Sequence, residues 1–280
     1  MTAVHNQNSS ETITKIEKNH YTERIKKNFD RAAEFYDREA SVQYQAGTAL
    51  CALLHSGYSP SGIIDLGCGT GRITIQLSEK FPGIRCDGID ISEKMISIAK
   101  KNKRTSPSTC PGFFTGDLMQ WVSGNIQGTN PAMYDLVFSN FTLQWIENLP
   151  LFLRQIREKS RSPVTLVFSI ALKETFSELS DAVKSIIPEY KPAITQAELS
   201  GIADFVDAAG FSIITSSEHR IHTPFHSVYD VLRHVQRTGV GSPQNSGTFT
   251  PALLRRLETE WGRGKKGITY HWGAFVCRAK

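Results

Sequence analysis

The chain has 280 residues, of which 40% are hydrophobic and 21% charged, so it can bury a sizeable core and does not belong to the disordered class. The formal net charge of +5 is a mild basic excess, too small by itself to indicate a nucleic-acid-binding protein. Five cysteines are scattered without a C-x-x-C pair, which argues against a metal site and against a disulfide framework.

The N-terminal residues 1–20 are polar and predict a flexible tail. This tail lacks the apolar stretch of a signal peptide, and no segment of the chain reaches the length of a transmembrane helix. We therefore expect a cytoplasmic monomer that binds neither membrane nor nucleic acid. Apolar residues recur at helical spacing over 21–38 and 42–55, which predicts a pair of N-terminal helices within 21–57.

Strands and helices then alternate through the rest of a single domain, 21–280. The predicted strands cover 62–66, 84–91, 112–117, 134–140, 164–169, 211–221 and 268–277. The alternation predicts an α/β fold of the Rossmann-like class: a mostly parallel, seven-stranded sheet with helices on both faces. Residues 173–193 and 222–265 interrupt it, and we expect the second stretch to be a helical insertion that forms a lid.

A glycine-rich loop joins the first strand of this sheet to the next helix, with Asp65, Gly67, Gly69 and Gly71 in the order D-x-G-x-G-x-G. Glycines permit a tight turn and let the backbone approach a ligand. The dinucleotide fingerprint G-x-G-x-x-G seats a pyrophosphate, whereas this loop has a different spacing and begins at an acid. A carboxylate disfavours a phosphate but attracts the cationic amino-acid half of S-adenosylmethionine (SAM), directly or through water. The loop therefore indicates SAM rather than NAD.

Three further signals lie at the ends of the next strands. Asp90, followed by Ile91, comes one helix and one strand after the loop, where an acid can accept both ribose hydroxyls. Asp117, followed by Leu118, is placed to meet the adenine amino group, and Asn140 ends the fourth strand. Singly, the two acids could be helix caps and Asn140 a turn residue. At the carboxyl ends of successive strands, they and the loop together predict a SAM site.

This set of residues resembles the class I (Rossmann-like) SAM-dependent methyltransferases over residues 60–220. Three segments make the resemblance more specific. Residues 28–36 look like the F-x-R-A-A-x-x-Y helix of the malonyl-acyl-carrier-protein O-methyltransferases of biotin synthesis, and residues 139–145 are similar to that family's S-N-x-x-x-Q-W. The tail to residue 271 resembles the family too, which extends the likeness from about residue 24 to the end. The family's Arg-Pro-x-Gly turn is replaced here by residues 160–163.

The resemblance implies that the chain methylates the free carboxylate of malonyl-acyl-carrier protein, giving the methyl ester that primes pimeloyl synthesis for biotin. The methyl group of a sulfonium is already activated, and a carboxylate is already a nucleophile at neutral pH. No general base is needed, so alignment in a water-poor pocket can suffice. The absence of a Ser/His/Asp or Cys/His arrangement agrees with this chemistry, and we expect no metal.

The acceptor carboxylate needs partners, and Tyr36, Gln144 and Trp145 are candidates to position it. Tyr36 would close over SAM from its helix; core packing is the alternative for both Tyr36 and Trp145. An arginine is a further candidate, but Arg31, Arg233 and Arg237 can each be a solvated surface charge. A basic rim would steer an acidic carrier protein, for which we predict four residues. They are Arg233, Arg237, Lys265 and Lys266.

The loop indicates the cofactor but not the acceptor, so other functions stay open. One is methylation of another acceptor, such as a small acid as in trans-aconitate-type carboxyl methylation, a quinone precursor or tRNA. Another is a non-catalytic module that binds SAM or a partner. An NAD-dependent enzyme is the third, and the G-x-G-x-G spacing disfavours it.

Overall fold

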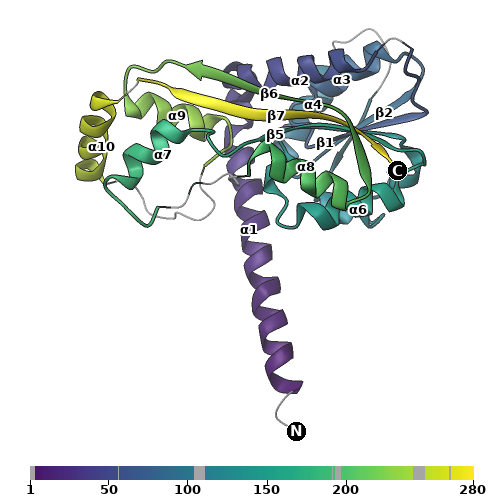
Figure 1. The fold of residues 1–280 in the computed structure, drawn as a ribbon, viewed down its shortest axis with the longest axis horizontal. Coiled ribbons are helices and arrows are strands. Elements are labelled where there is room, and N and C mark those ends of the chain that lie inside the picture. Colours follow the sequence, from purple (N-terminus) through teal and green to yellow (C-terminus); the bar gives the residue numbers. More distant parts are fainter. Residues whose placement is uncertain are drawn as a thin grey trace.

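A computed structural model describes residues 4–55, 57–103, 111–190, 192, 197–241, 250–264 and 266–280, with the backbone alone for 4–19 and 263. Seven strands form one sheet in the order β3-β2-β1-β4-β5-β7-β6 (Figure 1). They are β1 (Gly62–Leu66), β2 (Arg85–Asp90), β3 (Gly112–Thr115), β4 (Leu136–Asn140), β5 (Thr165–Ala171), β6 (Phe211–Thr223) and β7 (Ile268–Ala279). The first five are parallel, and β7 is antiparallel to both β5 and β6. The predicted mostly parallel, seven-stranded sheet is confirmed.

The central strands are short apolar runs because both faces of the sheet are covered. Every residue of β1 and β5 is buried. In β1, Ile64 pairs with Asp87 on one side and Val137 on the other. The carboxyl ends of β1, β2, β3 and β4 consequently meet at one edge, where the polar residues that follow them gather.

The described part of the chain contains ten α-helices. They are α1 (Val4–Glu39), α2 (Ser41–Leu53), α3 (Arg72–Lys80), α4 (Glu93–Lys103), α5 (Leu118–Val122), α6 (Leu149–Lys159), α7 (Ser177–Lys184), α8 (Leu199–Ala208), α9 (Val228–Arg237) and α10 (Pro251–Arg263). Helices α2, α3 and α4 cover one face, where Leu50 and Leu77 pack with Phe138. Helices α5, α6 and α8 cover the other, where Trp121, Phe152 and Val206 share a core. None of the described helices has the combination of length and apolarity needed to cross a membrane.

A second core lies beside the sheet, in a unit that we call the cap: the end of α1 with α7, α9, α10 and the extended ends of β6 and β7 (Figure 1). Val231, Leu257, Trp261 and Tyr270 are buried within it. The predicted insertion 222–265 contains α9 and α10, while residues 242–249 and 265 lie outside the described part of the chain. Its action as a lid stays a prediction.

Helix α1 begins at Val4, well before the predicted start at residue 21. The prediction rested on apolar periodicity, which begins only near Tyr21, so the polar residues before it were assigned to a tail. No glycine or proline occurs between Val4 and Glu39, and without a breaker the helical hydrogen bonds continue upstream. Figure 1 shows this first part of α1 extending away from the rest of the protein.

The sheet core gives a direct stability prediction. The ring of Phe275 stacks on that of Phe168 with centroids 4.8 Å apart, and both side chains are fully buried. We expect Phe275→Ala to lower the free energy of unfolding by about 3–5 kcal/mol, measured by urea denaturation. Ile214→Ala is the control, since that side chain is 64% exposed and should lose less than about 0.5 kcal/mol. Equal losses in the two variants would contradict this view of the core.

Candidate active site

The glycine loop after β1 uses the backbone freedom of glycine at three positions. Gly67, Gly69 and Gly71 have φ angles of +74°, +54° and +78°, in the left-handed region. A Cβ at Gly67 or Gly71 would lie 2.1 or 2.6 Å from a neighbouring side chain, so these two glycines also serve packing. At Gly69 the nearest atom belongs to the ring of Tyr36, 3.8 Å away. The backbone at Gly69 therefore faces open space, as a loop that contacts a ligand requires.

Asp90 joins this loop to the start of α4. Its Oδ2 accepts a hydrogen bond from the Gly69 N–H at 2.9 Å, and its Oδ1 accepts one from the Ser92 N–H at 2.8 Å. Burial raises the pKa of Asp90 to about 6, although these two bonds lower it in part. The carboxylate keeps further lone pairs for a ligand, so its predicted role toward ribose hydroxyls is chemically available.

Asp65 is more deeply buried, with 2% of its surface exposed. Burial raises its pKa to about 7; the hydrogen bond from Thr74 Oγ1, 2.7 Å long, lowers it, and the charge of Asp90 raises it further. Two buried acids close to each other are poorly stabilised when both are ionised. A cationic group bound nearby would stabilise them, which fits the amino-acid end and the sulfonium of SAM.

The predicted cofactor residues line two adjoining cavities. The larger, which we call the main pocket, encloses about 710 Å³ including the space open to solvent. Seven predicted residues line it: Gly67, Gly69, Asp90, Ile91, Asp117, Leu118 and Asn140. Asp65 lines a neighbouring cavity of about 460 Å³, the loop pocket, which shares Gly67, Gly69 and Asn140 with the first. Gly71 lines neither, so its part is to shape the turn.

Helix α1 crosses the edge of the main pocket and is fixed at two points. The Ser92 hydroxyl donates to Asp30 Oδ1 at 2.6 Å, and the Thr70 hydroxyl donates to Asp37 Oδ1 at 2.5 Å. Tyr36 lies between these attachments and lines both pockets. Burial raises its pKa, and the charge of Asp90 adds to the shift, so the phenol keeps its proton.

Two predicted residues carry structural roles as well. The Asp117 carboxylate accepts hydrogen bonds from two backbone N–H groups in the first turn of α5, which is the helix cap considered as the alternative. Asn140 donates to the Gln43 carbonyl at 2.9 Å and accepts from the Ser169 hydroxyl at 2.7 Å. Asn140 thus ties β4 to α2 and β5, while both residues line the main pocket. Their contacts with adenine and cofactor stay predictions.

A third cavity of about 330 Å³, the inner chamber, adjoins the main pocket and shares Phe29, Tyr36, Phe141 and Trp145 with it. Gln144 also lines it and donates to the Phe141 carbonyl at 2.7 Å. The indole N–H of Trp145 is buried and finds no hydrogen-bond partner among the described residues. The structure therefore gathers the three predicted positioning residues, Tyr36, Gln144 and Trp145, around one chamber beside the main pocket.

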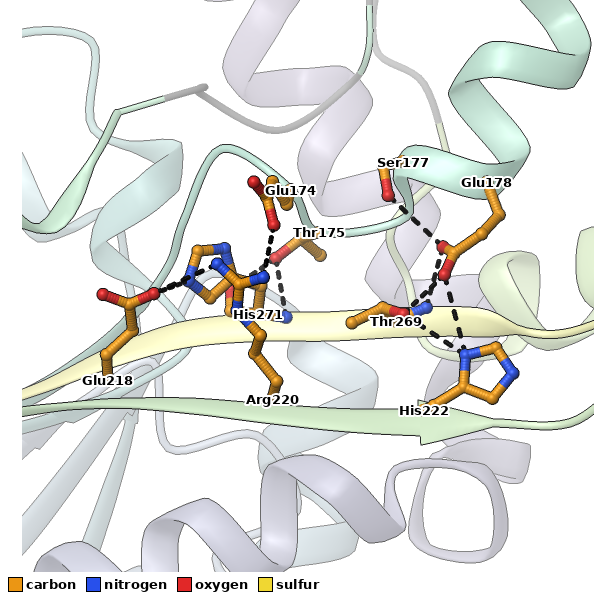
Figure 2. Close-up of polar contacts among 9 residues, drawn as sticks. All are labelled: Glu174, Thr175, Ser177, Glu178, Glu218, Arg220, His222, Thr269 and His271. Atoms are coloured by element: carbon orange, nitrogen blue, oxygen red, sulfur yellow. Dashed lines mark hydrogen bonds and ion pairs between the residues drawn. The ribbon is translucent and has the colours of Figure 1, made fainter. Parts of the chain in front are cut away.

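The connector between β5 and α7 forms part of the wall of this chamber through Thr175 and Phe176. The Thr175 hydroxyl donates to the His271 carbonyl at 2.5 Å and accepts from the His271 N–H at 3.2 Å. Figure 2 shows a chain of ion pairs and a hydrogen bond that also holds this connector against β6 and β7. It runs through Glu174, Arg220, Glu218 and His271. The wall is therefore fixed from outside the chamber.

The predicted arginines do not line the main pocket or the inner chamber. Arg237 donates to Glu39 at 2.9 Å, and its guanidinium lies 4.6 Å from the centre of the Phe35 ring. Arg233 is largely exposed and pairs with Asp230 at 3.5 Å. Arg31 and Lys266 are exposed, and Lys265 lies outside the described residues, as does Cys110. Of the predicted basic rim, Arg233 and Lys266 are exposed to solvent, whereas Arg237 is engaged with Glu39 and Phe35.

The sequence argument missed residues that the fold brings to the site. Phe141 takes a φ of +50°, and this backbone turn after β4 places it between the main pocket and the inner chamber. No sequence pattern signals such a conformation in a phenylalanine. Asp30 and Asp37 could have been found from the sequence. They are seven residues apart and therefore lie on one face of their helix, as do Phe29 and Tyr36.

The raised pKa of Asp65 predicts how the ligand-free protein responds to pH. The folded state holds its proton up to about pH 7, whereas an unfolded Asp loses it near pH 4, so Asp65 destabilises the fold progressively between these values. We expect Asp65→Asn to raise the free energy of unfolding at pH 8 by on the order of 1–3 kcal/mol, and by much less at pH 4. Denaturation at the two pH values measures this. An equal gain at both would show that the carboxylate charge is not the cause.

Comparison with known proteins identifies the family. Residues 64–161 match a methyltransferase domain. Among solved structures, a methyltransferase fold from Bacillus halodurans superposes with a TM-score of 0.58 at 10% identity, covering 84% of this chain and 98% of that one. Magnesium protoporphyrin IX methyltransferase from Synechocystis, solved with bound SAH, gives 0.53 at 18% identity, covering 85% and 83%. These likenesses confirm the class I methyltransferase fold.

Sequence relatives are more specific. The malonyl-[acyl-carrier protein] O-methyltransferase of Bacillus cereus is 35% identical over 264 residues, which cover 88% of this chain and 93% of that protein. A protein of the same name from Ilyobacter polytropus is 28% identical over 240 residues, covering 85% and 88%. The chain belongs to the malonyl-[acyl-carrier protein] O-methyltransferase family.

Proposed function

We propose that this protein transfers the methyl group of SAM to the free carboxylate of malonyl-acyl-carrier protein, giving the malonyl methyl ester that primes pimeloyl synthesis for biotin. The observation that carries the proposal is the pair of adjoining cavities: a main pocket whose charged lining residues are two acids, Asp90 and Asp117, and an inner chamber lined by neutral polar and aromatic side chains. The first suits a cationic cofactor, and the second offers uncharged hydrogen-bonding groups to an acceptor. The names of the sequence relatives support the malonyl group as that acceptor.

The residues present fit SAM. The backbone at Gly69 faces open space, the buried acids Asp65 and Asp90 have raised pKa values that a cation would relieve, and Asp90 retains lone pairs for ribose hydroxyls. When bound, SAM supplies a methyl group already activated on a positively charged sulfur. The protein then needs to hold the acceptor in line and keep water away, which is alignment rather than acid–base catalysis.

Tyr36, Trp145 and Gln144 are the side chains that we assign to this alignment. Tyr36 and Trp145 line both the main pocket and the inner chamber, so they stand where the two reacting groups meet. Each can donate one hydrogen bond, and the N–H of Trp145 has no partner among the described side chains. Gln144 lies in the chamber with its amide already directed at the Phe141 carbonyl, which fixes its orientation. Monomeric state and cytoplasmic location stay predictions.

The decisive experiment measures the mass of the acyl-carrier protein after the reaction. The protein is incubated with SAM and malonyl-acyl-carrier protein, and mass spectrometry of the carrier should show the addition of one methyl group. Asp90→Asn should abolish or strongly slow this addition by weakening SAM binding, which isothermal titration measures separately. SAM binding without methylation of any malonyl thioester would favour the non-catalytic module. Methylation of small carboxylates in preference to the malonyl thioester would favour another acceptor.

The exposed basic residue of α9 provides a test of the carrier. Acyl-carrier proteins are acidic, and Arg233 is 58% exposed in its side chain. We expect Arg233→Glu to raise KM for malonyl-acyl-carrier protein about 3–10-fold at low salt and to leave KM for malonyl-CoA unchanged. Arg161→Glu is the matched control, because this exposed residue lies outside α9, before the amino end of β5 and away from the carboxyl ends of the parallel strands. If the two charge-reversal variants changed KM for malonyl-acyl-carrier protein equally, α9 would not be part of the docking surface for the carrier.

A further inference from the structure

The inner chamber has to hold an anion without a cation in its own lining. Its described lining contains no Lys, Arg or His. Besides the predicted positioning residues, four polar side chains line the chamber, each from a different segment of the chain. They are Gln43, Thr175, Thr238 and Tyr270. A carboxylate in a buried, neutral chamber is costly unless donors and a positive charge lie close by. The charge must therefore come from behind the lining.

One buried ionisable group lies directly behind it. His234 on α9 is 8% exposed, and its Nε2 lies 2.7 Å from the hydroxyl oxygen of Tyr270. Its Nδ1 lies 3.1 Å from Glu39 Oε2, and the other oxygen of Glu39 accepts from Arg237 at 2.9 Å. A line of four side chains thus runs from the chamber wall to the surface: Tyr270, His234, Glu39 and Arg237.

The hydroxyl of Tyr270 sits where this line meets the chamber. Burial raises the pKa of Tyr270, and hydrogen bonding with Gln43 and Thr238, both in the chamber lining, offsets part of the shift. The phenol therefore keeps its proton. The pKa of Glu39 is lowered: burial acts to raise it, but the hydrogen bonds of His234 and Arg237 outweigh that effect. Glu39 is consequently an acceptor only, and His234 must donate to it through Nδ1–H.

The protonation state of His234 then decides what Tyr270 can do. A neutral imidazole that donates through Nδ1 has only a lone pair at Nε2, so the Tyr270 O–H must point at it. An imidazolium donates from Nε2 to the Tyr270 oxygen instead. The phenolic hydrogen is then released, and it can point into the chamber. Only the imidazolium state offers an acceptor carboxylate both a donor and a nearby positive charge.

We propose that Tyr270 binds the acceptor carboxylate in the inner chamber and that His234, as an imidazolium paired with Glu39, is the positioning residue that directs the Tyr270 hydroxyl toward it. This inference rests on the proposed function, since it names the group that recognises the malonyl carboxylate. It also gives the protein a way to distinguish a malonyl thioester from the acetyl thioester, which lacks the carboxylate.

Every charged or titratable group that packs around His234 enters the pH dependence. Glu39 comes from α1, Arg237 from the same helix and Tyr270 from β7, while Tyr36 on α1 faces Tyr270. On the side of α10, Glu258 accepts from the first N–H of α9. The pair Asp230 and Arg233 is exposed. Among these, His234 is the group whose charged form the proposal requires, because only the imidazolium can donate from both ring nitrogens.

The experiment measures the binding of malonyl- and acetyl-acyl-carrier protein to the whole enzyme, with S-adenosylhomocysteine present so that no methyl transfer occurs. We expect the wild type to bind the malonyl form at least tenfold more tightly near pH 6 and to lose this preference as the pH rises to 9. Tyr270→Phe should reduce the preference to within about twofold and raise KM for the malonyl carrier at least tenfold. Affinity for SAM should change by less than twofold.

Tyr134→Phe is the matched control, since it also removes a buried hydroxyl with a 2.7 Å hydrogen bond, to Asp87, but lies outside the described cavities. It should keep the preference for the malonyl form. His234→Gln should make the preference independent of pH, because glutamine keeps hydrogen-bonding groups without a titrating charge.

A wild-type preference that Tyr270→Phe leaves intact would overturn the inference. Should that variant fail to fold, an unchanged pH dependence in His234→Gln would overturn it equally. Failure of the wild type to methylate the malonyl carrier would refute the proposed function, and the binding preference would still report on Tyr270 and His234 independently.

Discussion

The attachment of α1 across the carboxyl edge of the sheet is the constraint on which the site depends. Asp30 accepts from the Ser92 hydroxyl, and that same hydroxyl oxygen accepts from the Met95 N–H at the start of α4. An anion at the N-terminus of a helix is favourably placed, so Asp30 holds α1 to α4 by a charge-assisted bond. Asp37 makes the second attachment, at the glycine loop. Tyr36 lies between the two attachments and lines the main pocket, the loop pocket and the inner chamber.

The function that we propose requires two ligands of opposite charge to be kept apart. The acids Asp65, Asp90 and Asp117 are grouped around the main pocket and the loop pocket, where a cationic cofactor would stabilise them. The same acids would repel a carboxylate acceptor placed beside them. The inner chamber has neutral hydrogen-bond donors, and aromatic rings lie between it and the main pocket. The acceptor carboxylate can therefore approach the cofactor without contacting the acids. The ring of Phe29 packs edge-on against Trp145, with centroids 6.0 Å apart, and stiffens that boundary.

The sequence predicted the sheet well, and most residues predicted to bind the cofactor line one cavity, because both sets of signals are local. A buried strand is a short apolar run, and Gly67, Gly69 and Asp90 follow strand ends directly. The inner chamber has no such signal. Gln43, Thr175 and Tyr270 come from α2, the β5–α7 connector and β7, and only tertiary packing brings them together. The sequence also did not predict the start of α1 at Val4. Apolar periodicity indicates the face that a helix buries, and the polar residues before Tyr21 show no such periodicity.

The two spaces present opposite electrostatic conditions. In the ligand-free protein, burial favours the protonated forms of Asp65 and Asp90, so a cation bound beside them would lower their pKa and release protons. In the inner chamber, the proposed partner of the anion is the Tyr270 hydroxyl, with His234 Nε2 2.7 Å behind it. A methyl transfer between a sulfonium and a carboxylate consumes no proton, so the electrostatics of the site match the chemistry that we assign to it.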